Sequence, residues 1–444
     1  MKIAIIGGGL SGLLCAVMLE QQGYSPTIYE RLPKIGGVLD SFKRKKILFD
    51  IGFHYSGALA KGDYLYNSMQ KIDLLNKLSF ESYPASFDRL FIDNEEFEIP
   101  NSSKEFKEQL QKRFPKEAQN IEKFFQKCYE ASTISSKVEN FVTIDSRSLK
   151  DVLVDIKDTT LRKIFLHFTI FYASAFYEEA SFDFYAKIFI NMLDGTRKVE
   201  GGGGAIIDGL QSLLKRTTIY KRSEVTKLFQ NEDGITALES NGEVKEYDSV
   251  ISTLHPKKTL AILENLDKKQ RRYKKHIDEL EESPSFFSIF CLIDAKIEQN
   301  LYFYEDEFIS VLPSREYEGK TVATILAGSD YKSYAQLSKD EYKIKKEQEC
   351  AYHLERVKQI YDFGDIEVID SSTPRTKQHY SNGCDGSIYG IMCSAKQKSL
   401  SVVMPRTRID KLYFAGENIL APGLIGAFLG AEILMNYFKT KENI

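Results

Sequence analysis

The chain has 444 residues, with 60 Lys and Arg against 63 Asp and Glu, and its formal net charge of −3 gives no argument for a nucleic-acid partner. Its six cysteines and six histidines lack the spacing of metal ligands, so no metal is expected, and the cysteine usage fits a reducing compartment. The length allows two or more domains with a sizeable core.

The N-terminal segment predicts a strand, a glycine turn, a helix, a second strand and an acid. An apolar run over Lys2–Ile6 is followed by a glycine-rich turn and by a helical pattern through Gln22. A second apolar run, Thr27–Tyr29, ends on Glu30. This order is typical of a dinucleotide-binding unit, in which the acid binds ribose hydroxyls and would repel the 2′-phosphate of NADP.

The three glycines of the turn have separate physical roles. Gly7 allows the tight turn, Gly9 lets the backbone approach a pyrophosphate, and Gly12 lets the helix pack close to the sheet. The helix then directs its unpaired N–H groups, at Leu10 and Ser11 among others, and its positive dipole end toward the phosphates.

Further glycine-rich segments lie at both ends of the chain. Gly36–Gly37 follow the acid, and Phe49–Gly52 comes soon after. Near the other end, Leu412–Glu417 contains a Gly-Glu pair and is followed by the glycine-containing stretch Pro422–Ala427. Both ends of the chain therefore have the pattern of cofactor loops.

These segments resemble those of the FAD-dependent amine oxidase and phytoene desaturase superfamily. The fit is closest to the branch of phytoene desaturases, carotenoid isomerases and retinol saturases, because Phe49–Gly57 looks like the retinol saturase version of that segment. Thr373–Gly390 resembles a segment that lies near the flavin in that branch. The resemblance implies FAD as the cofactor and an α/β fold: a Rossmann-like FAD-binding domain, with a mixed parallel sheet plus a small antiparallel sheet, and an inserted α+β substrate domain.

The resemblance also implies roles for individual residues. Val225 would hold the adenine through its backbone, and Glu417 would accept a hydrogen bond from the ribityl chain or order the pyrophosphate loop. The helix that starts at Gly423 would stabilise negative charge on the flavin N1 and O2 atoms. Arg31 would pair with the pyrophosphate or with a nearby acid, or would be a surface arginine. The full set expected to contact FAD is Gly7, Gly9, Leu10, Ser11, Gly12, Glu30, Arg31, Gly36, Gly37, Gly52, Phe53, Val225, Gly416, Glu417, Gly423, Leu424, Ile425 and Gly426.

Two side chains in Phe49–Gly57 can exchange protons. By resemblance this stretch passes along the flavin ring, so His54 and Tyr55 are candidates to face the substrate and shuttle a proton. The alternative for His54 is a structural histidine that only hydrogen-bonds a backbone carbonyl.

We expect the two domains to be interleaved along the chain. The FAD-binding domain would be assembled from residues 1–60, 200–256 and 394–444. The substrate domain would be formed by the inserted segments, residues 61–199 and 257–393.

The first inserted segment carries local signals. Asp93-Asn94 within an alternating run predicts a hairpin, and caps at Asn101 or Ser102 and at Ser148 predict helix starts. Residues 164–193 form the most aromatic part of the chain. They are either a buried helix pair or, as the family's lipid substrates favour, the wall of an apolar substrate channel or a patch that dips into one lipid leaflet.

The expected function is redox chemistry or isomerisation at carbon–carbon bonds of a polyene or isoprenoid lipid, with the flavin exchanging a hydride. One alternative is a flavin amine oxidase acting on small polar amines, and another is a non-catalytic lipid escort on the same fold. No stretch reaches the ~20 apolar residues of a membrane-spanning helix, and a strand that begins at Lys2 leaves no signal peptide. We therefore expect a cytoplasmic protein, with peripheral contact to the inner face of a membrane and the oligomeric state left open.

Overall fold

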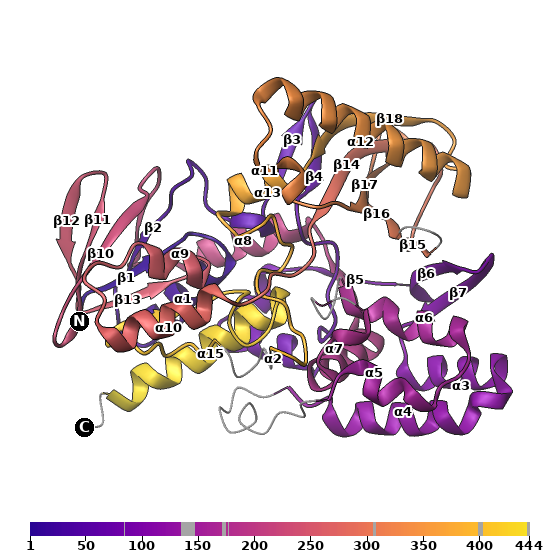
Figure 1. Cartoon of the computed structure of the whole chain (residues 1–444), viewed down its shortest axis with the longest axis horizontal. Coiled ribbons are helices and arrows are strands. Elements are labelled where there is room, and N and C mark those ends of the chain that lie inside the picture. The colour runs from indigo at the N-terminus through magenta and orange to yellow at the C-terminus, as the bar shows by residue number, and fades with distance from the viewer. Residues whose placement is uncertain are drawn as a thin grey trace.

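The computed structural model describes residues 1–83, 85–134, 147–170, 175, 177–304, 308–397 and 403–441 of the chain. Figure 1 shows one sheet around β1 and β13, a second sheet beside the long helix α12, and a group of helices from α3 to α7 below the second sheet. The indigo N-terminal strand and the yellow C-terminal helix lie in the same part of the molecule.

The first sheet has five parallel strands in the order β19–β13–β1–β2–β9. Three of its strands, β1, β13 and β19, are buried along their whole length, as expected for a parallel sheet covered on both faces. The strand nearest the C-terminus is therefore separated from the first strand by β13 alone. The strands are β1 (Ile3–Ile6), β2 (Thr27–Tyr29), β9 (Thr218–Tyr220), β13 (Ser249–Ser252) and β19 (Leu412–Phe414).

Helices and a small sheet complete this part of the molecule. Helix α1 (Leu10–Gln21) packs against both α15 (Gly423–Lys441) and α8 (Gly202–Leu213). The expected combination of a parallel sheet with a small antiparallel sheet is confirmed. The small sheet and the two helices that follow are β10 (Val225–Asn231), β11 (Gly234–Ser240), β12 (Glu243–Glu246), α9 (Pro256–Ala261) and α10 (Lys268–Asp278).

The second sheet has seven strands in the order β18–β14–β17–β16–β15–β6–β7. Neighbouring strands are antiparallel except β15 and β6, which are parallel. Val357 of α12 (Lys339–Ile360) packs with Ile289 and Phe303 in the core on one face. The strands are β6 (Ser86–Ile92), β7 (Glu95–Pro100), β14 (Phe286–Ile293), β15 (Asn300–Tyr304), β16 (Phe308–Tyr317), β17 (Lys320–Gly328) and β18 (Ile366–Ser372).

The helical group is held together by aromatic rings. The ring centroids of Phe124 and Phe165 lie 4.3 Å apart, and those of Phe125 and Phe189 lie 5.3 Å apart. In the aromatic region 164–193, the described residues thus include parts of two buried helices, while 171–174 and 176 lie outside the described residues. A role as a channel wall or lipid patch stays a prediction. The helices are α3 (Ser103–Arg113), α4 (Ala118–Ala131), α5 (Leu149–Val152), α6 (Thr159–Phe168) and α7 (Phe182–Gly195).

The local signals of the first inserted segment are confirmed. Asp93 (φ 54°) and Asn94 (φ 61°) form the turn between β6 and β7, as the type I′ hairpin requires. Ser102 caps α3, and Ser148 forms a capping box at the start of α5. Of the helices among the described residues, none combines the length and apolar character needed to cross a membrane.

The chain crosses from the first sheet to the second at Glu281–Ser285 and returns at Ser387–Met392. The two crossing segments run antiparallel and are joined by backbone hydrogen bonds, such as that from the Ser283 N–H to the Gly390 carbonyl (2.6 Å). They form a ladder between the two sheets, whereas the division into two domains by residue ranges stays a prediction. The remaining short elements are β3 (Ser41–Arg44), β4 (Ile47–Asp50), α2 (Tyr64–Lys71), β5 (Phe80–Ser82), β8 (Arg197–Val199), α11 (Lys332–Ala335) and α13 (Pro374–Ser381).

Candidate functional site

The glycine turn after β1 leaves no room for side chains. A Cβ at Gly12 would overlap the carbonyl oxygen of Gly7, so α1 packs this close to β1 only because residue 12 is glycine. Gly9 is the N-cap of α1 and offers no side-chain acceptor, and the first turn of the helix carries no acid. The N–H groups and the positive dipole end at the helix start are therefore suited to an anionic ligand.

Glu30 lies beside this turn and is held by backbone donors. Its Oε2 accepts from the Gly8 N–H (2.8 Å), and its Oε1 accepts from the Leu32 N–H (2.7 Å). The residue is buried, so these charge-assisted bonds replace much of its contact with water. The carboxylate thus ties the glycine turn to the end of β2, where an acid could bind ribose.

Arg31, the next residue after Glu30, reaches to helix α13. Its Nη2 donates to the carbonyl oxygens of His379 (2.6 Å) and Tyr380 (3.3 Å) in the last turn of α13. Such bonds complement the negative end of the helix dipole. In this arrangement Arg31 joins α13 to the end of β2, and its contact with a pyrophosphate stays a prediction.

Two further loops come to the start of α1. The Gly36 N–H donates to the Gly8 carbonyl (2.9 Å), so the paired glycines lie against the first turn. From the C-terminal end, a Cβ at Gly416 would lie 3.8 Å from the Ser11 Oγ, and Gly416 has φ +127°. A turn without side chains, a helix start without a side-chain cap and a neighbouring acid together fit a dinucleotide.

Glu417, in the loop after β19, and Lys377, in α13, carry opposite charges that act on each other. Burial raises the pKa of Glu417, although the Lys377 ammonium opposes this effect. Burial also lowers the pKa of Lys377 to about 8, although Glu417 opposes it. The Tyr389 ring lies 3.7 Å from where a Cβ would stand at Gly423, the first residue of α15. The segment after β18, which resembles a segment near the flavin in the family, is therefore folded over the start of α15.

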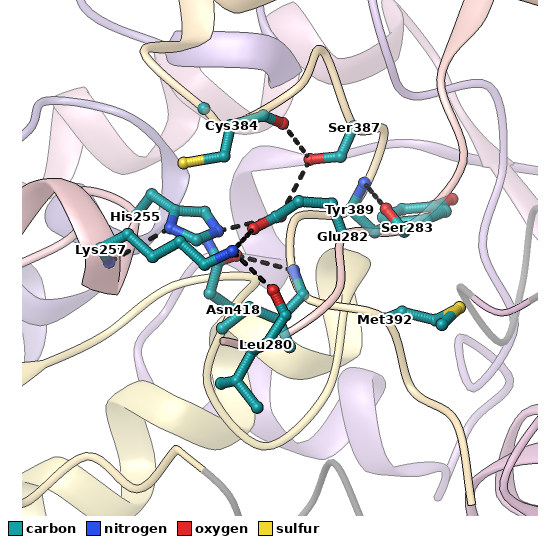
Figure 2. A network of polar contacts seen from close by, with 12 residues as sticks. His255, Lys257, Leu280, Glu282, Ser283, Cys384, Ser387, Tyr389, Met392 and Asn418 are labelled. Atoms are coloured by element: carbon teal, nitrogen blue, oxygen red, sulfur yellow. Dashed lines mark hydrogen bonds and ion pairs between the residues drawn. The ribbon is translucent and has the colours of Figure 1, made fainter. Parts of the chain in front are cut away.

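Figure 2 shows a second group of polar side chains, where the crossing segments meet the loop after β13. The Glu282 carboxylate lies 3.1 Å from His255 Nε2 and 2.8 Å from Lys257 Nζ. Burial would lower the pKa of His255, but Cys384 and Glu282 outweigh this effect and raise it to about 9. Burial would raise the pKa of Glu282, but His255 and Lys257 hold it below its usual value. The group therefore joins the first crossing segment to the parallel sheet by charge.

Part of this group has the composition of a metal site. A nitrogen of His255, a carboxylate oxygen of Glu282 and the Cys384 Sγ lie within 4.8 Å of one another. The Lys257 ammonium, however, already compensates the Glu282 carboxylate at 2.8 Å, so a bound cation would have to displace it. That the protein works without a metal stays a prediction.

Asp50 links the cofactor loops to the second sheet. Its Oδ2 lies 2.6 Å from the Arg315 Nη2 of β16. A Cβ at Gly202, the first residue of α8, would overlap the same carboxylate. Both the guanidinium and the positive end of α8 therefore stabilise the charge of Asp50. Two residues later, a Cβ at Gly52 would lie 3.0 Å from the Val38 carbonyl oxygen, which sets this segment against the Gly36–Gly37 turn.

His54 and Tyr55 have different surroundings. The Nδ1 of His54 is buried without a hydrogen-bond partner among the described residues, and burial lowers the pKa of His54 to about 4, although Asp50 opposes it. His54 is therefore neutral near pH 7, where it holds no extra proton to give. The Tyr55 hydroxyl donates to Asp88 Oδ1 (2.9 Å) and lies 2.6 Å from the Tyr302 hydroxyl.

The structure also places the remaining residues that were expected to contact FAD. The Ser223 N–H donates to the Glu30 carbonyl (2.8 Å), so β10 and its first residue, Val225, begin close to the acid. Phe53 is buried, as are Leu424 and Ile425 in the first turn of α15. The contacts of these residues with a cofactor stay predictions.

Sequence reasoning missed several residues of this region. Asp50 offered a signal, because a carboxylate that ends an apolar strand next to a glycine segment needs a partner. Lys377 and His255 gave none, since their partners Glu417 and Glu282 are distant in the chain.

The flavin containing amine oxidoreductase family matches residues 10–425 of this chain. The all-trans-retinol 13,14-reductase of Danio rerio is 23% identical over 510 aligned residues, which cover 96% of this chain and 84% of the relative. A 4,4′-diapophytoene desaturase of Staphylococcus haemolyticus is 22% identical over 72% of this chain and 67% of its own length. Among solved structures, an oxidoreductase from Methanosarcina mazei has the same fold, with a TM-score of 0.74 at 19% identity, over 98% of this chain and 100% of that chain.

The two bonds of Glu30 predict the effect of Glu30→Gln on flavin binding. An amide keeps one acceptor oxygen and turns an NH₂ group toward the other backbone N–H, so the glycine turn loses one charged anchor. We expect flavin to bind about tenfold more weakly, since hydrogen bonds to charged groups contribute roughly 1.5–3 kcal/mol. Fluorescence titration of the deflavinated protein measures this change. Glu232→Gln, an exposed site on the small sheet, is the control, and equal affinity in both variants would contradict the role of Glu30.

The raised pKa of His255 predicts a pH-dependent contribution to stability. The folded value of about 9 exceeds the value of about 6.5 for an unfolded chain. The contribution is therefore complete below about pH 6.5 and is lost as the pH rises through about 9. His255→Gln should lower the free energy of unfolding most near pH 6 and least near pH 9.5. The loss at the two pH values should differ by at most about 3 kcal/mol.

Calorimetry or circular dichroism melts across this pH range measure the difference between wild type and variant. His276→Gln, at an exposed position of α10, is the matched control and should lower stability less than His255→Gln does near pH 6. A constant offset for His255→Gln would mean that the histidine packs there without gaining a proton.

Proposed function

The chain belongs to the flavin-containing amine oxidoreductase family, and we propose that it uses FAD to desaturate, saturate or isomerise carbon–carbon bonds of an apolar polyene or isoprenoid substrate. The observation that carries the proposal is the convergence of Gly7–Gly12, Gly36–Gly37 and Gly416 at the start of α1. It occurs in a chain that aligns over most of its length with a reductase of a polyene alcohol.

The geometry supports roles for several residues in holding FAD. Glu30 would take the ribose hydroxyls, and the N–H groups at Leu10 and Ser11 would take the pyrophosphate. The N-terminus of α15, beginning at Gly423, would stabilise negative charge on the pyrimidine side of the flavin. When bound, the flavin supplies the acceptor or donor of a hydride.

Tyr55 is the better of the two expected proton carriers. Its hydroxyl already takes part in hydrogen bonds through which a proton can be replaced. His54 would keep its neutral imidazole close to the cofactor loops without gaining charge at neutral pH. We assign proton exchange with the substrate to Tyr55.

The experiment uses the purified protein with its flavin. Extraction and chromatography identify the flavin, which we expect to be FAD. All-trans-retinol is added anaerobically to dithionite-reduced protein, and 4,4′-diapophytoene in liposomes is added to oxidised protein. We expect one of these polyenes to change the flavin absorbance and to give a product with two hydrogens more or fewer, or with a shifted double bond. The same spectra recorded with putrescine test the amine oxidase alternative. Flavin reduction by the amine with release of peroxide, and no change with either polyene, would overturn the proposal.

A further inference from the structure

We propose that Asp88 receives and returns the proton exchanged with the substrate, that Tyr55 carries this proton between them, and that His167 positions Asp88. This inference rests on the proposed function and deepens it, because it adds Asp88, the carboxylate to which the Tyr55 hydroxyl donates. Asp88 comes from β6, Tyr55 from the Phe49–Gly57 segment and His167 from α6.

Asp88 is a buried carboxylate surrounded by donors. Its side chain is fully buried in β6, between Phe87 and Arg89 of the chain. Burying a carboxylate is costly unless donors replace the lost water. Here Asn300 Nδ2 donates to Oδ1 (2.8 Å), and His167 Nε2 lies 2.9 Å from Oδ2. Tyr55 supplies a third bond, at 2.9 Å from Oδ1.

His167 is fixed from both sides of its ring. While its Nε2 faces Asp88, its Nδ1 lies 2.7 Å from the Tyr304 hydroxyl. A neutral imidazole satisfies both contacts when Nε2–H donates to Asp88 and the Tyr304 hydroxyl donates to Nδ1. The side chain of His167 is fully buried, so it acts on the carboxylate and not on a substrate.

Tyr55 connects this carboxylate to the cofactor loops. It is half-buried, whereas Asp88 is fully buried. It follows Gly52, which lies against the Gly36–Gly37 turn. Its oxygen also lies 2.6 Å from the Tyr302 hydroxyl, so it keeps a hydrogen-bond partner while its own proton moves. Tyr55 is therefore placed to exchange a proton with a substrate on one side and with Asp88 on the other.

The exchange balances in both directions. In desaturation, the flavin of the proposed function, when bound, would supply the acceptor for a hydride from one substrate carbon. The neighbouring C–H bond gives its proton to the Tyr55 oxygen, and its electron pair becomes the new double bond. The Tyr55 O–H proton moves at the same time to the Asp88 carboxylate, which becomes a carboxylic acid. In saturation, Asp88 returns the proton through Tyr55 to one carbon, and the other carbon receives the hydride.

The charges and titratable groups around Asp88 bear on any pH dependence. Tyr55, Asn300 and His167 bond to it directly, and Tyr302 and Tyr304 lie one bond further. Lys198 and Tyr83 lie close enough to feel its charge. Variants of Asp88 and Tyr55 therefore keep Lys198, so that its charge acts equally in all of them.

The main experiment uses Tyr55→Phe in the flavin-loaded protein. Reduced protein is mixed with all-trans-retinol in D₂O, and the product is examined by NMR for deuterium at each of the two saturated carbons, because the hydride of a reduced flavin also exchanges with solvent. We expect the rate of deuterium delivery to fall about 10²–10⁴-fold, as for the loss of a general acid. Flavin affinity should stay close to wild type, because the ring of Tyr55 is retained, whereas the unfolding temperature should fall, because the buried Asp88 carboxylate loses one donor. Tyr83→Phe is the matched control: its hydroxyl lies 3.3 Å from Asn300 and it does not bond to Asp88.

Asp88→Asn and His167→Gln test the residues behind Tyr55. We expect Asp88→Asn to lose one limb of the pH profile of deuterium delivery, whereas a merely structural defect would lower the rate equally at every pH. A readout without turnover is the imidazole N–H signal of His167 in protein labelled with ¹⁵N at histidine. We expect this signal to shift in Asp88→Asn and to be unchanged in Tyr83→Phe.

The outcomes separate the two proposals. Wild-type turnover of the polyene with an unaffected Tyr55→Phe variant would overturn the relay and leave the proposed function intact. An unshifted histidine signal in Asp88→Asn would overturn the role of His167. A wild-type protein that exchanges no hydrogen with either polyene would overturn the proposed function and the relay with it.

Discussion

Donors from distant parts of the chain surround several buried carboxylates in this molecule. Glu30 takes two backbone N–H groups, and Glu282 takes a histidine and a lysine. Asp50 takes the Arg315 guanidinium from the second sheet. A buried charge without these partners would be strongly unfavourable, so each carboxylate requires several elements to be in place at once. The relative positions of the two sheets depend on this requirement as well as on packing.

The same requirement connects the cofactor loops with the interior of the second sheet. Asp50 and Tyr55 lie on one segment, and each reaches across to the second sheet, to Arg315 and to Asp88. The antiparallel ladder between the two crossing segments also connects the two sheets, and the ion pair of Glu282 with Lys257 reinforces it. The polar groups of this segment are therefore already oriented by their partners, which is the condition for efficient proton transfer.

The sequence was sufficient where a structural feature is local. The turn Gly7–Gly12, the hairpin at Asp93-Asn94 and the caps at Ser102 and Ser148 follow from backbone conformation and short-range hydrogen bonds. The resemblance to the family predicted which segments of the chain form the cofactor loops. It could not supply pairs such as Asp88 with His167, because residues separated by 79 positions meet only through the fold. Arg31 illustrates the same limit, since its carbonyl partners lie in α13, at the other end of the chain.

The order of strands in the parallel sheet has a consequence for the synthesis of the protein. Strand β13 pairs with β1 on one side and with β19 on the other, and β19 begins only at Leu412. While the ribosome is still translating the second sheet, one edge of β13 and the face of α1 that packs against α15 have no native neighbour. Exposed strand edges favour aggregation, and long-range pairing is slow to form. A chaperone that shields the nascent chain until α15 emerges would therefore act on this sheet first.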